Sequence, residues 1–448
     1  MINHRAIILE TLLLIEKEED YSHHIIRDVL DKYDYLPKQE RSFIKRVTEG
    51  TLERKIELMY VIDRFSKVKC TKMKPVIRLI LEMSVYQLLY MDAIPDSAVC
   101  NEAVKLSGKK GFHNLKGFVN GVLRTILRNK DTIEYPDINQ DAVAYLSVRY
   151  SMPEWIVRLF LKEHGAENTE KMLMSFLEKK STMIRINQSK IEKEKLLSLL
   201  LAEQVTVRES KLLPYALKIS GMDQISEMST FKKGYFQVQD ISSMLVCELA
   251  GIREEQTVLD VCAAPGGKAM HAADILHGTG KVIACDVSAQ KVALIDEHVS
   301  RYRYENVETL ERDARIFSEE FRELADVLLV DVPCSGLGIM GRKNDIKYRL
   351  DKERLDSLST LQKEIVTNVA GYVKPGGTIM YSTCTIRQAE NEEMVSYILE
   401  NLPFEAVDFY DSLPQGLKLE SAKNGYAQFL PGIHGTDGFF IARFRRKG

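Results

Sequence analysis

Apolar residues in the first 130 positions recur at helical spacing. Two such stripes are formed by Ile8, Leu9, Leu12 and Leu13 and, further on, by Phe43, Val47 and Leu52. Residues spaced i, i+3, i+4 and i+7 share one face of a helix, so this pattern predicts amphipathic helices. A last helix is predicted over 115–128. The pattern as a whole predicts an all-α bundle over residues 1–135.

Mixed patterns follow a polar break that contains Pro136. Ser151, Pro153 and Glu154 are typical of a helix start, because serine caps free N–H groups and proline fits the first turn. The predicted strands are 182–187, 205–208 and 215–219, and a helix is predicted over 190–203. Residues 140–235 are therefore expected to form a small α+β domain.

The pattern changes again at residue 236. Short runs rich in Val, Ile and Leu alternate with helical stretches such as 289–302 and 352–373. The predicted strands are 257–262, 282–286, 307–312, 327–331, 378–382 and 439–444. Strands that alternate with helices are typical of a doubly wound, mostly parallel sheet. We therefore expect an α/β domain over residues 236–448.

Composition and charge narrow the class of protein. The chain has 448 residues, 45% of them apolar, which is enough for several globular domains. No uncharged apolar window of about 18 residues is present, so we expect no membrane span. The net charge is −2, but residues 1–130 hold 23 Lys and Arg against 17 Asp and Glu, a net of +6. A phosphate-bearing partner would fit this excess, but charge alone favours a solvated helix surface as the explanation.

The seven cysteines are scattered and form no Cys-x-x-Cys pair. In a chain with no recognisable secretory signal, this usage predicts reduced thiols in the cytoplasm and no metal site. Most of the cysteines are expected to be small buried hydrophobes. Cys334 and Cys384 differ, because they follow predicted strands within the polar strings Asp331-Val-Pro-Cys334 and Ser382-Thr-Cys384-Thr385.

A turn of small residues follows the first strand of the α/β domain. It reads Cys262-Ala263-Ala264-Pro265-Gly266-Gly267-Lys268. Such a turn lets the backbone approach a ligand closely, and the next helix offers free N–H donors. The next three strands end at or near Asp286, Asp313 and Asp331. Because parallel strands gather their carboxyl ends at one edge, we expect these groups to line one crevice.

The turn also limits the class of ligand. A Walker phosphate loop needs Ser or Thr after its lysine, whereas Ala269 follows Lys268 here, and the Gly-x-Gly-x-x-Gly dinucleotide fingerprint is absent. A cofactor with a ribose but no phosphate fits better, because Asp286 can accept hydrogen bonds from ribose hydroxyls. S-adenosyl-L-methionine is such a cofactor.

Both cysteine loops follow the carboxyl ends of strands, so both thiols are expected beside the cofactor turn. Carbon 5 of a pyrimidine becomes nucleophilic enough to take a methyl group when a thiolate adds to carbon 6. Activation of the base at N3 is a role for Asp331. A lone cysteine at a strand end is more often a core residue. The polar neighbours favour a functional role here, but position alone does not decide which thiol attacks.

These strings resemble those of RNA (cytosine-5)-methyltransferases, and among them the bacterial 16S ribosomal RNA group with an N-terminal NusB-like helical domain. The similar strings are 258–268, 331–336, 382–385, Gln239–Ser243, Thr436–Phe440 and, in the first domain, Ile94-Pro95, Asn101–Val104 and 118–124. The resemblance covers nearly the whole chain. It implies a Rossmann-like catalytic domain with a mostly parallel, seven-stranded sheet.

The resemblance also implies roles for single residues. Cys384 would be the nucleophile, Cys334 would assist product release, and Asp331 would contact both the base and the cofactor. S-adenosyl-L-methionine would be held by Cys262, Ala263, Ala264, Pro265, Gly266, Gly267, Lys268, Asp286, Asp313 and Asp331. The implied activity is methylation of carbon 5 of a cytosine in 16S ribosomal RNA through a covalent cysteine adduct. The alternatives are the same chemistry on transfer RNA and a non-catalytic RNA-binding factor of ribosome assembly.

The segment after Cys334 carries the cations expected to hold the RNA backbone, which are Arg342, Lys343, Lys347 and Arg349. The family commonly has Arg-Arg-x-Pro-Asp-Ile-Lys-Trp at this point. This chain has Gly341-Arg-Lys-Asn-Asp-Ile-Lys-Tyr348, which lacks the first arginine, the proline and the tryptophan. We expect a cytoplasmic monomer that binds ribosomal RNA and does not associate with membranes.

Overall fold

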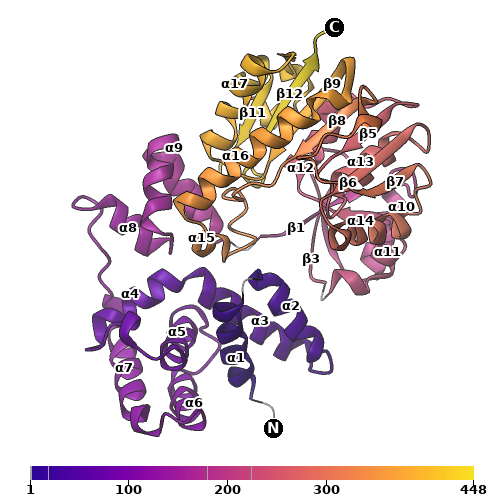
Figure 1. The fold of residues 1–448 in the computed structure, drawn as a ribbon. Helices are drawn as coiled ribbons and strands as arrows, with labels where there is room; N and C mark the ends of the chain where they lie inside the picture. The colour runs from indigo at the N-terminus through magenta and orange to yellow at the C-terminus, as the bar shows by residue number, and fades with distance from the viewer. Residues whose placement is uncertain (1–2, 19, 179, 223) are drawn as a thin grey trace. The chain divides into compact units, whose positions relative to one another are not determined.

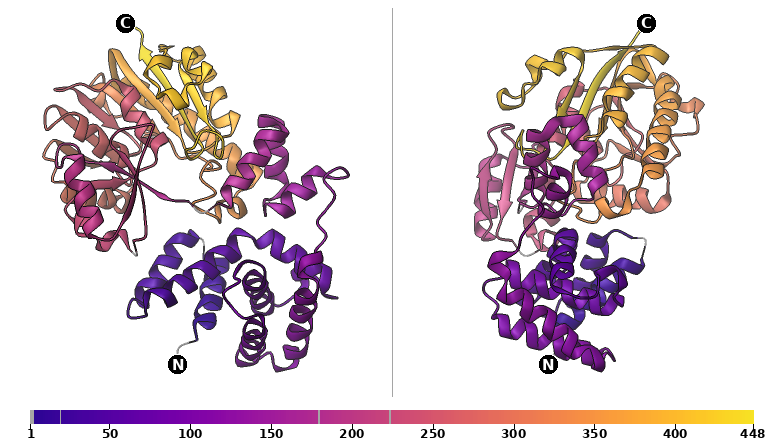
Figure 2. Two further views of the ribbon diagram at one scale, coloured as in Figure 1. Left: turned by 180° about the vertical axis from the view of Figure 1, so that it is seen from behind. Right: turned by 90° about the vertical axis from the view of Figure 1, so that its left-hand side faces the viewer.

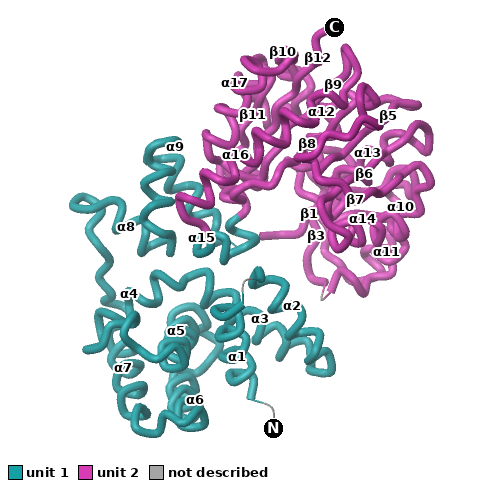
Figure 3. The backbone as a smooth tube through the Cα atoms, viewed as in Figure 1, with its two compact units in different colours: residues 1–178, 340–349 teal, residues 179–339, 350–448 magenta. Residues whose placement is uncertain are grey.

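The computed structural model describes residues 3–18, 20–178, 180–222 and 224–448. The chain forms two compact units, which are drawn in different colours in Figure 3. Unit 1 contains Met1–Glu178 together with Met340–Arg349, and unit 2 contains Lys179–Ile339 together with Leu350–Gly448. The chain therefore leaves unit 2 after Ile339 and returns to it at Leu350. Within the described ranges, no helix combines the length and apolar character needed to cross a membrane.

Unit 1 is helical (Figure 1), which confirms the prediction for the N-terminal part. Its central helix is α5 (Pro75–Tyr90), which contacts α1, α3, α4, α6 and α7. The other helices are α1 (His4–Lys17), α2 (Ser22–Lys32), α3 (Lys38–Glu53), α4 (Lys55–Phe65), α6 (Asp96–Lys109), α7 (Lys116–Arg128), α8 (Ala142–Arg149), α9 (Glu154–Phe176) and α15 (Ile346–Arg349).

The sequence of α5 explains its central position. Pro75 occupies the first turn, where its missing N–H costs nothing. The helix is apolar on nearly all sides, and a helix of that kind is stable only when it is surrounded by others. Its one buried carboxyl, that of Glu82, accepts from Arg78 at 2.9 Å. Burial raises the pKa of Glu82 to about 7.

Unit 2 contains a small antiparallel sheet in the order β2-β3-β1-β4. The strands are β1 (Thr182–Ile186), β2 (Thr206–Glu209), β3 (Ala216–Ser220) and β4 (Phe236–Val238), and α10 (Lys193–Ala202) lies between β1 and β2 in the chain. The first three strands confirm those expected from the sequence. The helices and strands of 140–235 are divided between the units, because α8 and α9 belong to unit 1. The three-domain division with boundaries at 135, 140 and 235 stays a prediction.

The large sheet has the order β10-β12-β9-β8-β5-β6-β7, and β11 pairs with β12. Its strands are β5 (Thr257–Asp260), β6 (Lys281–Asp286), β7 (Val307–Glu311), β8 (Ala325–Asp331), β9 (Val373–Thr383), β10 (Phe404–Ala406), β11 (Tyr426–Phe429) and β12 (Phe439–Arg446). The five strands β5 to β9 are parallel, which confirms the fold class. The expected number of seven strands is wrong, since eight are present among the described residues.

Alternating residues of the parallel strands face two separate cores. Val282, Ala284 and Leu329 belong to a core with α12 (Ile241–Ala250), α13 (Gly267–Ile275) and α14 (Ala289–Tyr302). Ile283 and Leu328 belong to the opposite core, with α16 (Lys352–Val369) and α17 (Glu392–Asn401). Figures 1 and 2 show these helices on the two faces of the sheet. With both faces covered, ligands can approach only at the edge where the strands end.

Candidate active site

The turn after β5 has the geometry expected of a cofactor loop. Gly266 precedes α13 with φ at 109°, a conformation that residues other than glycine rarely adopt. Helix α13 begins at Gly267, so its free N–H groups lie at the turn. The Ala264 N–H donates to Asp286 Oδ2 at 3.0 Å, which joins the turn to the end of β6. The sequence prediction that these residues come together is confirmed.

Asp286 and Asp313 follow neighbouring strands of the same sheet edge. Asp286 is 4% exposed and also accepts from the Val287 N–H and from the Lys291 ammonium, at 2.8 and 2.9 Å. A carboxylate has about four acceptor positions, so Asp286 retains capacity for a ligand hydroxyl. Asp313 is more accessible and pairs with Arg315 at 2.6 Å, which lowers the pKa of Asp313.

The chemistry of this edge fits S-adenosyl-L-methionine. A buried carboxyl at the end of β5, that of Asp260, has no well-aligned hydrogen-bond partner among the described residues, and burial raises its pKa to about 7. Together with Asp286, Asp313 and Asp331, it makes the edge rich in carboxyl groups. Such an edge favours a ligand with ribose hydroxyls and positive charge, and it disfavours a phosphate.

Both carboxylate oxygens of Asp331, at the end of β8, accept hydrogen bonds. Its Oδ2 accepts from the Lys268 ammonium at 2.6 Å, and its Oδ1 accepts from the Ser382 hydroxyl at 2.6 Å. Burial alone would lower the pKa of Lys268, but the contact with Asp331 raises it overall, so this side chain stays charged. The cofactor turn, β8 and β9 therefore meet at one carboxylate. The sequence does not predict the role of Ser382, because a serine two residues before a cysteine carries no signal of its own.

The two thiols predicted to work together are neighbours. Cys334 Sγ and Cys384 Sγ lie 3.2 Å apart, and both cysteines are half-buried. Contact with Cys384, together with burial, raises the pKa of Cys334 well above its usual value, and Glu390 and Asp331 add to the shift. The remaining cysteines include Cys70, Cys100, Cys247 and Cys285, which are buried as expected for core residues.

The cysteine loops touch a third loop that precedes β12. The Gly338 N–H donates to the Cys384 carbonyl at 3.1 Å, and the Gly438 N–H donates to the Gly338 carbonyl at 3.0 Å. A Cβ atom on Gly338 would lie 2.2 Å from the Gly438 oxygen, so only glycine allows this approach. The Thr436–Phe440 string therefore belongs to the site because its backbone closes it.

The predicted RNA contacts Arg342, Lys343, Lys347 and Arg349 lie in the segment that packs with unit 1. Lys347 is 4% exposed, and its ammonium donates to the carbonyls of Glu53 and Ser151 at 2.8 and 2.6 Å. A buried ammonium cannot reach a phosphate, so the structure does not support Lys347 as an RNA contact. Lys343 lies 5.5 Å from the Tyr21 ring, and Arg349 pairs with Asp345 at 2.9 Å.

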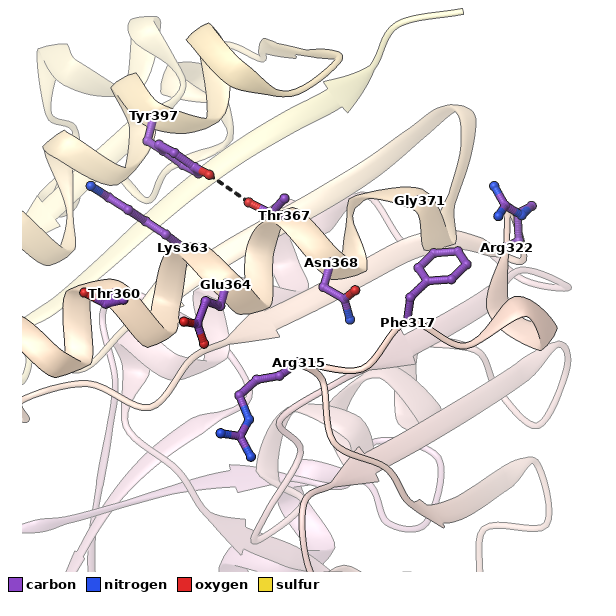
Figure 4. Close-up of a pocket in the computed structure, with 10 residues that line it drawn as sticks. All are labelled: Arg315, Phe317, Arg322, Thr360, Lys363, Glu364, Thr367, Asn368, Gly371 and Tyr397. Atoms are coloured by element: carbon purple, nitrogen blue, oxygen red, sulfur yellow. Dashed lines mark hydrogen bonds between the residues drawn. The ribbon is translucent and has the colours of Figure 1, made fainter.

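A hollow of about 750 Å³ lies between the segment after β7 and helix α16. Figure 4 shows the residues that line it. Tyr397 and Thr367 form a hydrogen bond of 2.8 Å at its wall. None of the ten residues that line it is a predicted site residue. One lining residue, Arg315, pairs with Asp313 at 2.6 Å, so the hollow adjoins a residue that the sequence assigns to the cofactor.

Models of known families match three parts of the chain. Residues 248–445 match "16S rRNA methyltransferase RsmB/F", residues 2–128 match the NusB family, and residues 152–226 match a ferredoxin-like domain of RsmF/B-like methyltransferases. The NusB match confirms the resemblance predicted for the helical part.

Curated relatives match over the full length. The chain is 36% identical to the "Probable ribosomal RNA small subunit methyltransferase B" of Bacillus subtilis, over 99% of both chains. It is 30% identical to the protein of the same name from Synechocystis, over 100% of both chains.

Solved structures agree with the fold. The crystal structure of PH0851 has a TM-score of 0.83 and 25% identity, and the match covers 100% of this chain and 99% of that one. NSun6 from Pyrococcus horikoshii, solved with SFG, an analogue of S-adenosylmethionine, has a TM-score of 0.58 and 22% identity over 66% of this chain and 98% of its own. The chain therefore belongs to the RsmB/F family and is an S-adenosylmethionine-dependent RNA methyltransferase.

Proposed function

We propose that the protein methylates carbon 5 of a cytosine in 16S ribosomal RNA through a covalent adduct between Cys384 and carbon 6. One observation carries this proposal: two thiols lie 3.2 Å apart at the strand ends, beside Asp331 and the cofactor turn. Direct transfer to an oxygen or to an exocyclic nitrogen would need no thiol. A pair of thiols at the reacting edge fits a reaction in which carbon must become the nucleophile.

The surroundings of the thiols favour Cys384 as the attacking group, in agreement with the family resemblance. Because the pKa of Cys334 is raised, its thiol stays protonated and can donate a hydrogen bond toward Cys384 Sγ. A thiolate that accepts such a hydrogen bond is stabilised in its reactive form. We therefore assign attack to Cys384 and assistance in product release to Cys334.

The bond changes follow from these positions. Cys384 Sγ forms a bond to carbon 6, and the electron pair of the carbon 5–carbon 6 double bond becomes available at carbon 5. Asp331, held by Lys268 and Ser382, stabilises the activated base at N3. S-adenosylmethionine supplies the electrophilic methyl group when it is bound. A base then takes the carbon 5 proton, and the electron pair of that C–H bond restores the double bond. Cys384 leaves carbon 6 as a thiolate, to which the Cys334 thiol can donate a hydrogen bond.

We assign the cofactor to the turn 262–268 and to Asp286, Asp313 and Asp331. The Gly266 backbone leaves room for close approach, and Asp286 has acceptor capacity for ribose hydroxyls. Arg342, Lys343 and Arg349 remain candidates for contact with the RNA backbone. Cytoplasmic location and a monomeric state also stay predictions, and the free cysteines among the described residues fit a reducing compartment.

The substrate is tested with purified protein and tritiated S-adenosylmethionine. We expect label in 16S ribosomal RNA, as transcript or as small subunit, at a single cytosine mapped by bisulfite sequencing. The same cytosine should be unmethylated in ribosomal RNA from a deletion strain. Label in transfer RNA alone would redirect the assignment to that substrate, and absence of label in any RNA would favour the non-catalytic assembly role.

A further inference from the structure

A buried polar pair supports the two cysteine loops. Glu390 and Asn391 precede α17, and both are fully buried. Glu390 Oε2 accepts from the Ser335 N–H and from Gln362 Nε2, each at 2.9 Å. Gln362 Nε2 also donates to the Pro333 carbonyl at 2.9 Å. The Glu390 carboxylate thus fixes the main chain on both sides of Cys334.

Asn391 has the matching relation to Cys384. The Thr383 hydroxyl donates to Asn391 Oδ1 at 2.7 Å, and Asn391 Nδ2 donates to the Thr385 carbonyl at 3.2 Å. Residues on both sides of Cys384 are therefore held by one amide. The loops are also joined directly, because the hydroxyl oxygens of Ser335 and Thr385 lie 2.7 Å apart.

Stability alone does not explain a carboxylate at this place. A buried charge is unfavourable unless it is fully paired, and apolar side chains of similar size commonly serve a fold equally well. Glu390 Oε1 has no well-aligned hydrogen-bond partner among the described residues, and the nearest cation, Arg387, lies 3.9 Å away. Burial of this carboxylate therefore lowers the stability of the fold, and the carboxylate contacts the segment that carries a proposed catalytic thiol.

We propose that Glu390 and Asn391 are positioning residues, Glu390 for Cys334 and Asn391 for Cys384, and that together they set the 3.2 Å spacing on which separate attack and release depend. This inference rests on the proposed function of the two cysteines. Because each side chain holds a different loop, loss of each should slow a different step. Loss of Glu390 should slow product release, and loss of Asn391 should slow attack on carbon 6.

The electrostatics agree with this division. Three acidic groups face Cys334: the Cys384 thiol, the Glu390 carboxylate and the Asp331 carboxylate, and Lys268 pairs with the last of these. Contact with Cys384 and burial raise the pKa of Cys334, and the negative charge of Glu390 raises it further. Glu390 thus helps to keep Cys334 protonated as well as fixing its loop.

The test compares Glu390→Ala, Glu390→Gln and Asn391→Ala in the full chain. Glu393→Gln is the control, because Glu393 is an exposed carboxylate of α17 and its loss changes the charge by the same amount. RNA that contains 5-fluorocytidine blocks release, so a denaturing gel reports the rate of adduct formation. Ordinary RNA in the same gel reports how fast the adduct disappears. Calorimetry with S-adenosylhomocysteine verifies that each variant is folded.

With Glu390→Ala, we expect adduct formation within about twofold of wild type and adduct on ordinary RNA that persists about tenfold longer. Glu390→Gln should restore release, since its amide oxygen can accept from the Ser335 N–H. With Asn391→Ala, adduct formation should fall about tenfold. Glu393→Gln should match wild type in both measurements.

If Glu390→Ala releases its adduct at the wild-type rate, Glu390 has no role in release. The same follows if Glu390→Gln releases its adduct as slowly as Glu390→Ala. Wild-type adduct formation by Asn391→Ala would overturn the role of Asn391. If an alanine variant fails to bind the cofactor analogue, Gln362→Leu and Thr383→Val take its place with the same expected results. A wild-type protein that forms no adduct contradicts the proposed function, whereas unaltered variants beside a reactive wild type contradict this inference only.

Discussion

At the scale of single residues, the two cysteines differ in what surrounds them. The raised pKa of Cys334 keeps its thiol protonated, and the Sγ–Sγ distance of 3.2 Å lets that thiol face Cys384. Asp331 is fixed by an ammonium on one oxygen and a hydroxyl on the other, so it has little freedom to move. If these are the reacting groups, as we propose, they are placed before any substrate arrives, which lowers the cost of reaching the transition state.

Substitution of each cysteine should therefore give a different defect. Cys384→Ala is expected to lower methyl transfer by about a thousandfold or more and to form no adduct, because the nucleophile is gone. Cys334→Ala is expected to form the adduct and to accumulate it on ordinary RNA. A denaturing gel with labelled RNA distinguishes the two variants, and binding of S-adenosylhomocysteine should be unchanged in both. Full activity of Cys384→Ala would exclude it as the nucleophile.

At the scale of elements, the segment 340–349 shows that a basic stretch of sequence can contain a buried lysine. In the sequence its cations predict contact with RNA, yet Lys347 is buried within unit 1 and bonded to two main-chain carbonyls. Burial lowers the pKa of Lys347 to about 7. The segment directly follows the Cys334 loop in the chain, and Lys347 anchors it to the helices of unit 1.

This anchor predicts a pH dependence of stability. Unfolded lysine loses its proton near pH 10.4, and folded Lys347 near pH 7, so between these values the unfolded chain binds more protons. The free energy of unfolding of unit 1 should therefore rise with pH across this window, by up to about 1.4 kcal/mol per pH unit from this group. Lys347→Met should lack this contribution. Chemical denaturation of both proteins between pH 7 and pH 10 measures it, and equal slopes would contradict the burial of a titrating ammonium.

Periodicity predicts most of the elements of unit 2, because its strands are buried on both faces and read as runs of Val, Ile and Leu. Helix α14 begins and ends at the predicted residues, and the cofactor turn follows β5 as expected. Glu390 and Asn391 could not be found in this way. They lie in the polar string Ala389-Glu-Asn-Glu-Glu393, which is typical of a solvated surface, and only the tertiary fold buries them.

The strand β11 was missed for a related reason. It is four residues long and pairs with β12, and so short a strand shows no clear alternation of apolar and polar residues. The burial of Lys347 also depends on contacts with residues almost two hundred and three hundred positions away. Contacts between residues so far apart cannot be predicted from the local pattern of apolar and polar residues.

At the scale of the whole molecule, the hydrophobic cores follow the two units. One core draws its buried residues from 7–126, and the other two draw theirs from 184–441 and 259–444. The residues assigned to the cofactor all belong to unit 2. Ligand binding should therefore stabilise one unit and leave the other unchanged.

Calorimetric unfolding tests this separation. We expect two transitions, of which S-adenosylmethionine at about 100 times its Kd raises only that of unit 2, by an amount that corresponds to about 2.7 kcal/mol. The unit 1 transition is the internal control. A single transition that shifts as a whole would contradict independent cores, and no shift at saturating ligand would contradict the cofactor site.

The central claim is that Cys384 becomes bonded to the target base. The most direct measurement incubates the protein and S-adenosylmethionine with 16S ribosomal RNA that contains 5-fluorocytidine, followed by protease digestion and mass spectrometry of the trapped peptide. The account predicts a methylated fluorocytidine attached to the peptide that contains Cys384. Attachment at Cys334, or methylated RNA without any crosslinked peptide, would contradict it.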